Sequence, residues 1–431
     1  MWNGNQLWMS LDPPKDKFRA MSPCVGLTGP VARITLLGWN DRLRDWVQKV
    51  NMMLTRVIVT TAIALSSLFV SVAAGASLAR RPVAITDQSE AGPEYGFQGE
   101  YVGNVSGGYR RTRVGLQIVA RANHQLNAVE YRGGLPGSGW DGSEKLHSSG
   151  TWNGTVAILR GDARKIVIVN HEVWILSDGD VMRGIIKKVH RQSPTMGLLP
   201  PPGADVLFDG HSTIRLQGGR MTSTGLLQEG TETLDSVNDF RLHLEFRTPF
   251  MPAATGQGRG NSGIYIQRRY ELQILDSFGE EREYNFCGSL YKTRAPDVNM
   301  CLPPLTWQTY DVWFRAARFD AKRKKIADAR ITVVHNGVTI HDNVPIPHKT
   351  GAGQPEGPEP LPILFQDHHN PVRFRNIWLV HEAYPTDSDR RSSLPVFESA
   401  DRGVSRQSSI VLPLVSTNVA PLLSTPLGMR R

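Results

Sequence analysis

Cysteines and long apolar runs are scarce in this chain, which contains three cysteines in 431 residues. It has no CxxC pair, P-loop or HExxH motif, so the common structural-zinc, P-loop nucleotide and metalloprotease signatures are excluded. The formal net charge of +9 is diffuse along the chain, which argues against nucleic acid as the default partner. The 40% hydrophobic content exceeds that of a disordered chain, and the length fits two or three domains. Collagen-like, coiled-coil and polytopic membrane proteins are excluded.

One apolar stretch lies near the start of the chain, within residues 53–76. A single Arg precedes an uncharged run, and small residues follow at 74–76. This order is typical of a cleaved secretory signal, and the run is shorter than the about 20 residues that a membrane-spanning helix needs. A membrane anchor is the alternative. We predict a signal peptide at 52–76, export to the periplasm or the extracellular space, no stable membrane span after cleavage, and a misassigned extension over 1–51.

Export changes the interpretation of the cysteines. Cys24 falls within the predicted extension, which leaves Cys287 and Cys301 in the mature chain. In an oxidising compartment this pair favours a loop-closing disulfide over two free thiols or half of a metal site. We therefore predict a Cys287–Cys301 disulfide and no structural zinc.

Short alternating runs separated by glycine fill the rest of the chain. Residues 87–192 include VGLQIVA and KIVIVN, and residues 204–382 include FRLHLEFRT, SGIYIQRR and YELQILDS. Period-two runs of this kind with Gly-rich turns predict strands. We expect an all-β chain: a small module at 87–192 and a two-sheet sandwich or jelly roll at 204–382. A Pro-rich linker at 193–203 joins them, and a disordered tail follows at 383–431.

One strand face of the second domain is unusually polar. Alternation places Glu271 and Gln273 opposite the apolar residues of their strand, and it places Tyr265 and Gln267 together on the preceding strand. Carboxylates and amides match sugar hydroxyls as acceptors and donors. Asp276 comes as the strand ends and could reach the same cleft from its rim. The pattern favours a carbohydrate-binding cleft.

Two adjacent histidines, His368 and His369, follow a later apolar run. Histidine near carboxylates suits general acid–base transfer near neutral pH or coordination of a divalent metal. Both histidines could instead be surface turn residues. Spacing alone does not decide between these alternatives.

Seven motifs occur in order along the second domain: LFDG (207–210), NSGIYIQ (261–267), YELQILDS (270–277), CGSLY (287–291), WQTYDVWF (307–314), NGV (336–338) and FQDHHNPVRFRNIWL (365–379). Together they closely resemble the 3-keto-disaccharide hydrolase domain family, once described as a domain of unknown function. The resemblance spans residues 204–380, and an ordered string of motifs is more specific than any one of them.

The resemblance implies a concanavalin A-like jelly roll, related in fold to lectins and glucanases. It also implies action on 3-keto-glycosides, whose C3 hydroxyl has already been oxidised. A ketone at C3 acidifies the C2 hydrogen, so a base can remove it, the C1 substituent can leave by β-elimination, and water can add back. This route avoids an oxocarbenium ion. It needs an enolate stabiliser beside the C3 oxygen, and a divalent metal ion or a cationic donor are the candidates.

The matching motif positions carry over the family's functional residues. The resemblance implies a base, an acid or metal ligands at Glu271, Asp276 and His368. It implies sugar contacts from Asn261, Gln267, Gln273, Tyr291, Lys292, Gln366 and Arg373. His369 stands where the family usually has glycine. The first function hypothesis is an exported enzyme that cleaves 3-keto-glycosides. The second is a non-catalytic glycan-binding protein, and the third is a structural cell-surface protein.

Overall fold

The computed structural model describes residues 82–107, 110–161, 163–169, 172–382, 384 and 414–415. The predicted extension (1–51) and signal peptide (52–76) lie outside the described residues, as does most of the predicted tail. Strands dominate the described part, and its three short 3-10 turns are η1 (Gln88–Glu90), η2 (Pro93–Gly96) and η3 (Gly256–Gly258). The all-β prediction is confirmed. None of the helices in this part of the chain is long and apolar enough to cross a membrane.

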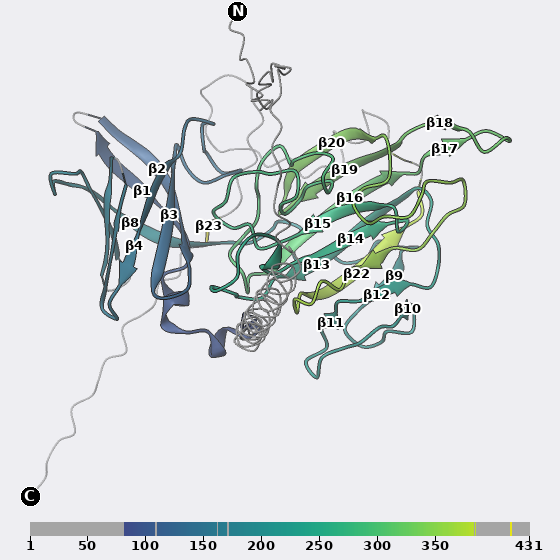
Figure 1. Cartoon of the computed structure of the whole chain (residues 1–431), viewed down its shortest axis with the longest axis horizontal. Helices are drawn as coiled ribbons and strands as arrows, with labels where there is room; N and C mark the ends of the chain where they lie inside the picture. Colours follow the sequence, from purple (N-terminus) through teal and green to yellow (C-terminus); the bar gives the residue numbers. More distant parts are fainter. Residues whose placement is uncertain are drawn as a thin grey trace, which may run out of the picture. The chain divides into compact units, whose positions relative to one another are not determined.

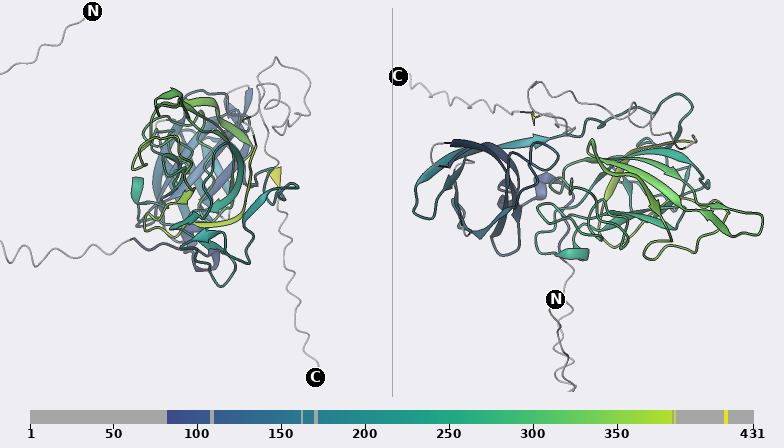
Figure 2. Two further views of the ribbon diagram at one scale, coloured as in Figure 1. Left: turned by 90° about the vertical axis from the view of Figure 1, so that its right-hand side faces the viewer. Right: turned by 90° about the horizontal axis from the view of Figure 1, so that it is seen from above.

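The first strands form one antiparallel sheet that closes on itself (Figure 2, right). Each strand pairs with the next, and the first also pairs with the eighth. These strands are β1 (Gly99–Gly107), β2 (Arg110–Ala120), β3 (Gln125–Arg132), β4 (Leu146–Trp152), β5 (Val156–Arg160), β6 (Lys165–Val169), β7 (Glu172–Leu176) and β8 (Met182–Arg191). A short strand, β23 (Leu414–Val415), pairs with β8.

Sequence alternation explains the interior of the closed sheet. On β5 and β6, Ala157, Leu159, Ile166 and Ile168 are buried, whereas Ile158 between them is 42% exposed. Burying each large apolar side chain contributes about 1.5–3 kcal/mol. The period-two pattern read from the sequence therefore builds a hydrophobic core of its own.

An ion pair is buried at the edge of this core. The Arg191 guanidinium donates from Nε to Glu100 Oε2 at 2.6 Å and from Nη1 to the Pro136 carbonyl at 2.6 Å. Gln117 Nε2 donates to Glu100 Oε1 at 2.9 Å, and the Tyr131 hydroxyl donates to Gln117 Oε1. Because Arg191 and Glu100 are almost fully buried, each charge depends on the other for its solvation.

The later strands form two sheets with one core between them (Figure 1). The five-stranded sheet has the order β10 (Leu216–Gln217), β12 (Thr231–Thr233), β21 (Leu364–Phe365), β14 (Ser262–Ile266) and β15 (Tyr270–Ile274). The seven-stranded sheet contains β11 (Leu227–Gln228), β22 (Arg373–Val380), β13 (Phe240–Arg247), β16 (Gln308–Arg315), β19 (Ala329–His335) and β20 (Val338–Ile346), with β9 (Asp205–Phe208) on β22. A small separate ribbon pairs β17 (Arg318–Phe319) with β18 (Lys325–Ala327).

Aromatic and branched side chains from both sheets fill the space between them. Ile264 and Leu272 of the five-stranded sheet share a core with Phe246, Tyr310 and Phe314 of the seven-stranded sheet. The Phe246 and Tyr310 rings lie 4.7 Å apart between centroids, close enough for a favourable tilted contact. The expected β-sandwich is therefore confirmed, with the apolar face of β14 and β15 turned inward.

The segment predicted as a linker has fixed contacts along the outer face of the seven-stranded sheet. Ser193 Oγ lies 2.6 Å from Thr309 Oγ1, and the Gly197 amide donates to Glu245 Oε1 at 2.6 Å. Asn376 also donates from Nδ2 to the Leu198 carbonyl. These bonds hold the start of residues 193–203 against the sheet, so it does not act as a free spacer.

Candidate active site

Glu271 occupies the middle of β15 on the face turned away from the core. Its cross-strand neighbour in the β14–β15 register is Tyr265, and residues directly opposite in an antiparallel pair bring their side chains together. The Tyr265 hydroxyl donates to Glu271 Oε2 at 2.7 Å. The sequence placed both residues on this face, and the structure confirms that placement.

A loop around residues 348–353 covers Glu271, whose side chain is only 2% exposed. The Glu271 amide donates to Thr350 Oγ1 at 2.6 Å. The next residue, Gly351, has φ +45°, and a β-carbon there would lie 2.7 Å from Tyr291 Cδ1 and 2.9 Å from Glu271 Oε2. A β-carbon at Gly263 would likewise lie 2.7 Å from Glu271 Oε1. Both positions require glycine because the carboxylate fills the space.

Burial sets the protonation of Glu271. It raises the pKa of this carboxyl to about 7, although the Tyr265 hydrogen bond and the Lys292 charge both lower it. A carboxyl group with a pKa near neutrality can take up and release protons efficiently near pH 7. Burial, together with the Glu271 charge, raises the pKa of Tyr265, so its phenol stays a neutral donor.

Amide side chains extend the polar face beyond Glu271. Gln273 Nε2 donates to Gln257 Oε1 at 3.2 Å, and Asn261 Nδ2 donates to the Gln257 carbonyl at 2.7 Å. The backbone N–H of Asn261 donates to Asn370 Oδ1 at 2.8 Å. Asn261 Oδ1 and Gln366 Oε1 are buried without a protein partner in the described structure. Such unsatisfied acceptors are rare in folded proteins and fit hydroxyl donors from a ligand.

Tyr291 and Lys292 lie near Glu271, and their role as sugar contacts stays a prediction. The Tyr291 amide donates to the Glu271 carbonyl at 3.1 Å. Lys292 is exposed, with its Nζ 5.4 Å from the centre of the Tyr291 ring. The Lys292 charge lowers the pKa of the Glu271 carboxyl, so this lysine is a cation near enough to influence its protonation.

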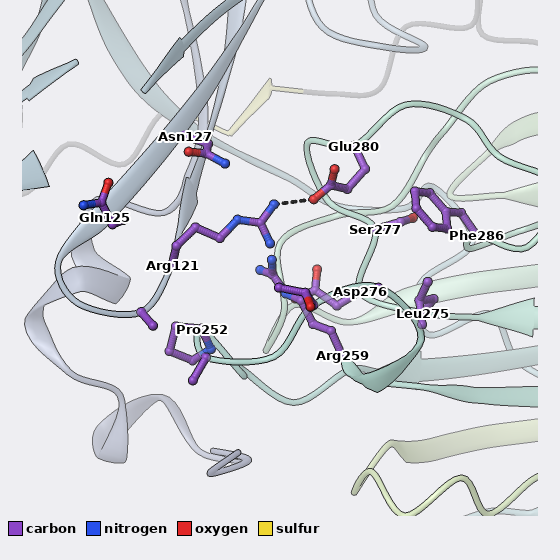
Figure 3. A pocket seen from close by; sticks show the side chains of 14 residues that line it. Arg121, Gln125, Asn127, Pro252, Arg259, Leu275, Asp276, Ser277, Glu280 and Phe286 are labelled. Carbon is purple, nitrogen blue, oxygen red and sulfur yellow. Dashed lines mark hydrogen bonds and ion pairs between the residues drawn. The ribbon is translucent and has the colours of Figure 1, made fainter. Parts of the chain in front are cut away.

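Asp276 faces a different space. Arg259 donates from Nε to Asp276 Oδ2 at 2.7 Å, and both side chains line a cavity that Glu271 does not line (Figure 3). Burial raises the pKa of Asp276, and the Arg259 charge opposes this. The role of Asp276 as an acid beside Glu271 stays a prediction, since its direct partner is an arginine.

Two predicted sugar contacts have structural partners instead. Gln267 lies in the turn after β14 with φ +51°, where strand alternation has ended. Its Nε2 donates to the Val237 carbonyl and its Oε1 accepts from Arg269. Arg373 lies on β22 of the other sheet and donates to Glu229 Oε2 at 2.7 Å. These contacts engage both side chains away from Glu271.

The two histidines lie exposed in the loop after β21. His369 has φ +62°, the left-handed conformation that glycine favours, and its side chain is 68% exposed. The residue therefore takes the backbone shape of the family's usual glycine, while its ring lies in solvent rather than beside Glu271. The catalytic or ligating role of His368 stays a prediction.

Metal binding needs several donors close together. Across the described residues, no group of three or more His, Cys, Asp or Glu side chains could hold a metal ion. Glu271, Asp276 and His368 therefore do not form a three-ligand cluster of the kind that holds a divalent ion.

Cys287 and Cys301 are both free thiols in the structure, so the predicted disulfide is absent. Both are buried in the sandwich core, where Cys287 Sγ lies 3.3 Å from the Tyr310 hydroxyl and Cys301 Sγ lies 3.5 Å from the Leu275 carbonyl. Burial keeps oxidants and thiol reagents away from such sulfurs.

We expect alkylation of the unfolded protein, without reductant, to label both Cys287 and Cys301. The native protein should resist labelling at both positions because each thiol is buried. Intact-mass spectrometry before and after alkylation measures this directly. Labelling of the unfolded chain only after reduction would show the disulfide and contradict the structure.

A β-sandwich whose outer face carries a buried near-neutral glutamate among amides fits a carbohydrate-active, glycosyl hydrolase-like protein. The chain belongs to the family described as 3-keto-alpha-glucoside-1,2-lyase-like domain, whose model matches residues 137–380. The match begins earlier than the resemblance at residue 204 and includes part of the closed sheet. No curated protein matches the chain.

Three solved structures from Parabacteroides distasonis, each described as a "putative glycosyl hydrolase", are similar to parts of the chain. The first is 28% identical with a TM-score of 0.41 and covers 45% of this chain and 91% of its own. The second is 16% identical with a TM-score of 0.30, covering 42% and 94%. The third is 20% identical with a TM-score of 0.29, covering 42% and 99%.

Sequence reasoning missed several residues around Glu271. Thr350 and Gly351 reach it from a loop about 80 residues further along the chain, and Gln257 and Asn370 reach the amide cluster from loops. The glycine-rich KTGAG sequence at 349–353 is typical of a loop. A local sequence pattern does not show which strand such a loop will cover.

Proposed function

We propose that this protein is an exported enzyme that cleaves 3-keto-glycosides with Glu271 as the base. The observation that carries the proposal is the buried Glu271 carboxyl, with a pKa of about 7 and a phenol donor at 2.7 Å, on the motif-bearing strand of the matched domain. The signal-like sequence at 53–76 supports export.

The reaction follows from the acidity of the C2 hydrogen beside the C3 ketone. The Glu271 carboxylate takes the C2 proton, and the C2–H electron pair moves onto the C3 oxygen as an enolate. As the C3 ketone re-forms, the C1–C2 double bond forms and the C1–O bond breaks. The departing oxygen gains a proton from water, Glu271 returns its proton to solvent, and addition of water across the double bond completes net cleavage. The Lys292 charge would stabilise the negative oxygen that develops at C3.

Substrate binding uses the groups that lack partners in the protein. Hydroxyls of the sugar would donate to Asn261 Oδ1 and Gln366 Oε1, which are buried acceptors. Because Gly351 lies against Glu271, the 348–353 loop must move aside for a sugar ring to reach the carboxylate. The closed loop would then exclude water from the reacting atoms.

We expect kcat/KM for a 3-keto-glucoside to rise with pH and to level off above an apparent pKa of about 7. Glu271 acts as a base only when deprotonated, and its pKa in the free enzyme is about 7. Tyr265→Phe removes a hydrogen bond that lowers this pKa, so the midpoint should move to higher pH. Initial rates of aglycone release across the pH range measure both effects.

A variant far from the site provides the control for this profile. Tyr101→Phe changes another buried phenol, whose hydroxyl donates to the Phe97 carbonyl in the closed sheet. It should leave the midpoint of the pH profile unchanged. A flat pH profile, or a midpoint that moves to lower pH in Tyr265→Phe, would contradict the role of Glu271 as base.

A further inference from the structure

A cavity of about 560 Å³ lies between the turn that joins β2 to β3 and the segments at η3 and after β15 (Figure 3). This volume falls in the range typical of small-molecule sites, about 300–1,000 Å³. Its charged and amide lining residues are Arg121, Gln125, Asn127, Arg259, Asp276 and Glu280. The mechanism proposed above uses none of them.

Arg259 gives this cavity an unmet hydrogen-bonding capacity. The side chain is 1% exposed, and its Nε is bonded to Asp276. Its Nη1 and Nη2 are buried without a partner among the described residues. Unpaired donors on a buried guanidinium are costly, so ligand oxygens at this place would stabilise the site.

The positive and negative side chains of the cavity are equal in number, which favours a neutral ligand. Arg259 pairs with Asp276, and Arg121 from the closed sheet pairs with Glu280, so two cations face two anions. A charged ligand would leave one charge unmatched. A neutral ligand with many hydroxyls can instead accept from guanidinium groups and exchange hydrogen bonds with the Asn127 amide.

A second hollow of about 420 Å³ adjoins the cavity and shares Arg121, Asn127 and Glu280 with it. The two together form an elongated polar surface, which suits a chain of sugar rings better than one compact molecule. The far end is lined by residues of β4, including His147 and Ser149.

The cavity lies close to Glu271 along the chain. Asp276 follows Glu271 by five residues, which span at most about 17 Å of extended strand at about 3.4 Å per residue. The η3 turn separates the two places: Thr255 and Gly256 line the cavity, whereas Gln257 turns to the amide cluster. One oligosaccharide could therefore occupy both.

We propose that this cavity is a second carbohydrate site, which binds neutral, unoxidised sugar residues of the glycan whose 3-keto ring reaches Glu271. The choice of ligand class rests on the proposed function, but the binding itself does not depend on turnover. The closed sheet then contributes to substrate selection through Arg121 and Asn127.

Isothermal titration calorimetry of the whole mature chain with unoxidised maltotriose tests this proposal. We expect Asn127→Ala to weaken binding about three- to tenfold, the value of one lost hydrogen bond. Arg259→Lys should weaken it by at least as much, because lysine cannot present two parallel donors. Asn104→Ala, an exposed asparagine of β1 outside the cavity, is the matched control and should bind like the unchanged chain.

A kinetic comparison separates this site from the catalytic one. In Asn127→Ala, KM should rise for a 3-keto-maltotrioside, while kcat/KM for methyl 3-keto-glucoside stays unchanged because that substrate is too short to reach the cavity. If the unsubstituted protein cleaved neither substrate, that result would count against the proposed function but not against the second binding site. No maltotriose binding by the unchanged chain, equal binding by Asn127→Ala, or binding of a sugar acid in place of maltotriose would overturn the second site.

Discussion

Replacing Glu271 with Gln should lower kcat for a 3-keto-glucoside about 10²- to 10⁴-fold, the usual contribution of a positioned general base. The substitution keeps the shape of the side chain, and the Tyr265 hydroxyl can still donate to the amide oxygen that replaces Oε2. Sugar binding should therefore change little. Aglycone release and calorimetric binding, measured on the same preparation, provide the two readouts.

The control for this result is Glu144→Gln, which neutralises an exposed glutamate of the closed-sheet part. It should turn over at the normal rate. A Glu271→Gln variant that retains full turnover would eliminate Glu271 as the base. A variant that loses binding and turnover together would favour a structural role for the Glu271 side chain.

Replacing Arg191 with Met should lower the free energy of unfolding by about 3–5 kcal/mol, because it leaves the Glu100 carboxylate buried without its partner. Folded domains are stable by only about 5–15 kcal/mol, so this loss is large. Denaturant unfolding followed by tryptophan fluorescence measures it. The double variant Glu100→Met with Arg191→Met should recover part of the loss, since an apolar pair carries no unpaired charge.

Lys165→Met is the matched control, because it breaks the ion pair with Asp180. The Lys165 side chain is 16% exposed and the Asp180 side chain is 62% exposed, so the carboxylate that the variant leaves unpaired stays hydrated. Exposed pairs contribute about 0–1 kcal/mol, so this variant should unfold almost normally. Equal losses for Arg191→Met and Lys165→Met would show that burial does not set the value of the inner pair.

Strand alternation was sufficient to predict the fold class and the strand face that carries Glu271. It assigned Glu271 and Tyr265 to one face because side chains alternate strictly within β14 and β15. The prediction failed for Gln267, where the strand ends in a left-handed turn and the side chain turns to the Val237 carbonyl. Face assignments made from sequence are therefore reliable only where the strand itself continues.

Contacts between segments that are far apart along the chain could not be predicted from the sequence. Gly351, in the 348–353 loop, lies against Glu271. Arg259, which pairs with Asp276, lies in an irregular segment. Neither segment has a periodic pattern that fixes its position. The predicted export made a disulfide the expected state of Cys287 and Cys301. In the structure both are thiols, with the Tyr310 hydroxyl near the Cys287 sulfur and the Leu275 carbonyl near the Cys301 sulfur.

The most direct test of the central claim is aglycone release from a 3-keto-glucoside and from its unoxidised parent glucoside, with hydrogen or deuterium at C2. Abstraction of the C2 proton by Glu271 predicts release from the 3-keto-glucoside only, slower with deuterium at C2 and about 10²- to 10⁴-fold slower in Glu271→Gln. Equal release from both glucosides, or release from neither by the folded protein, would contradict it.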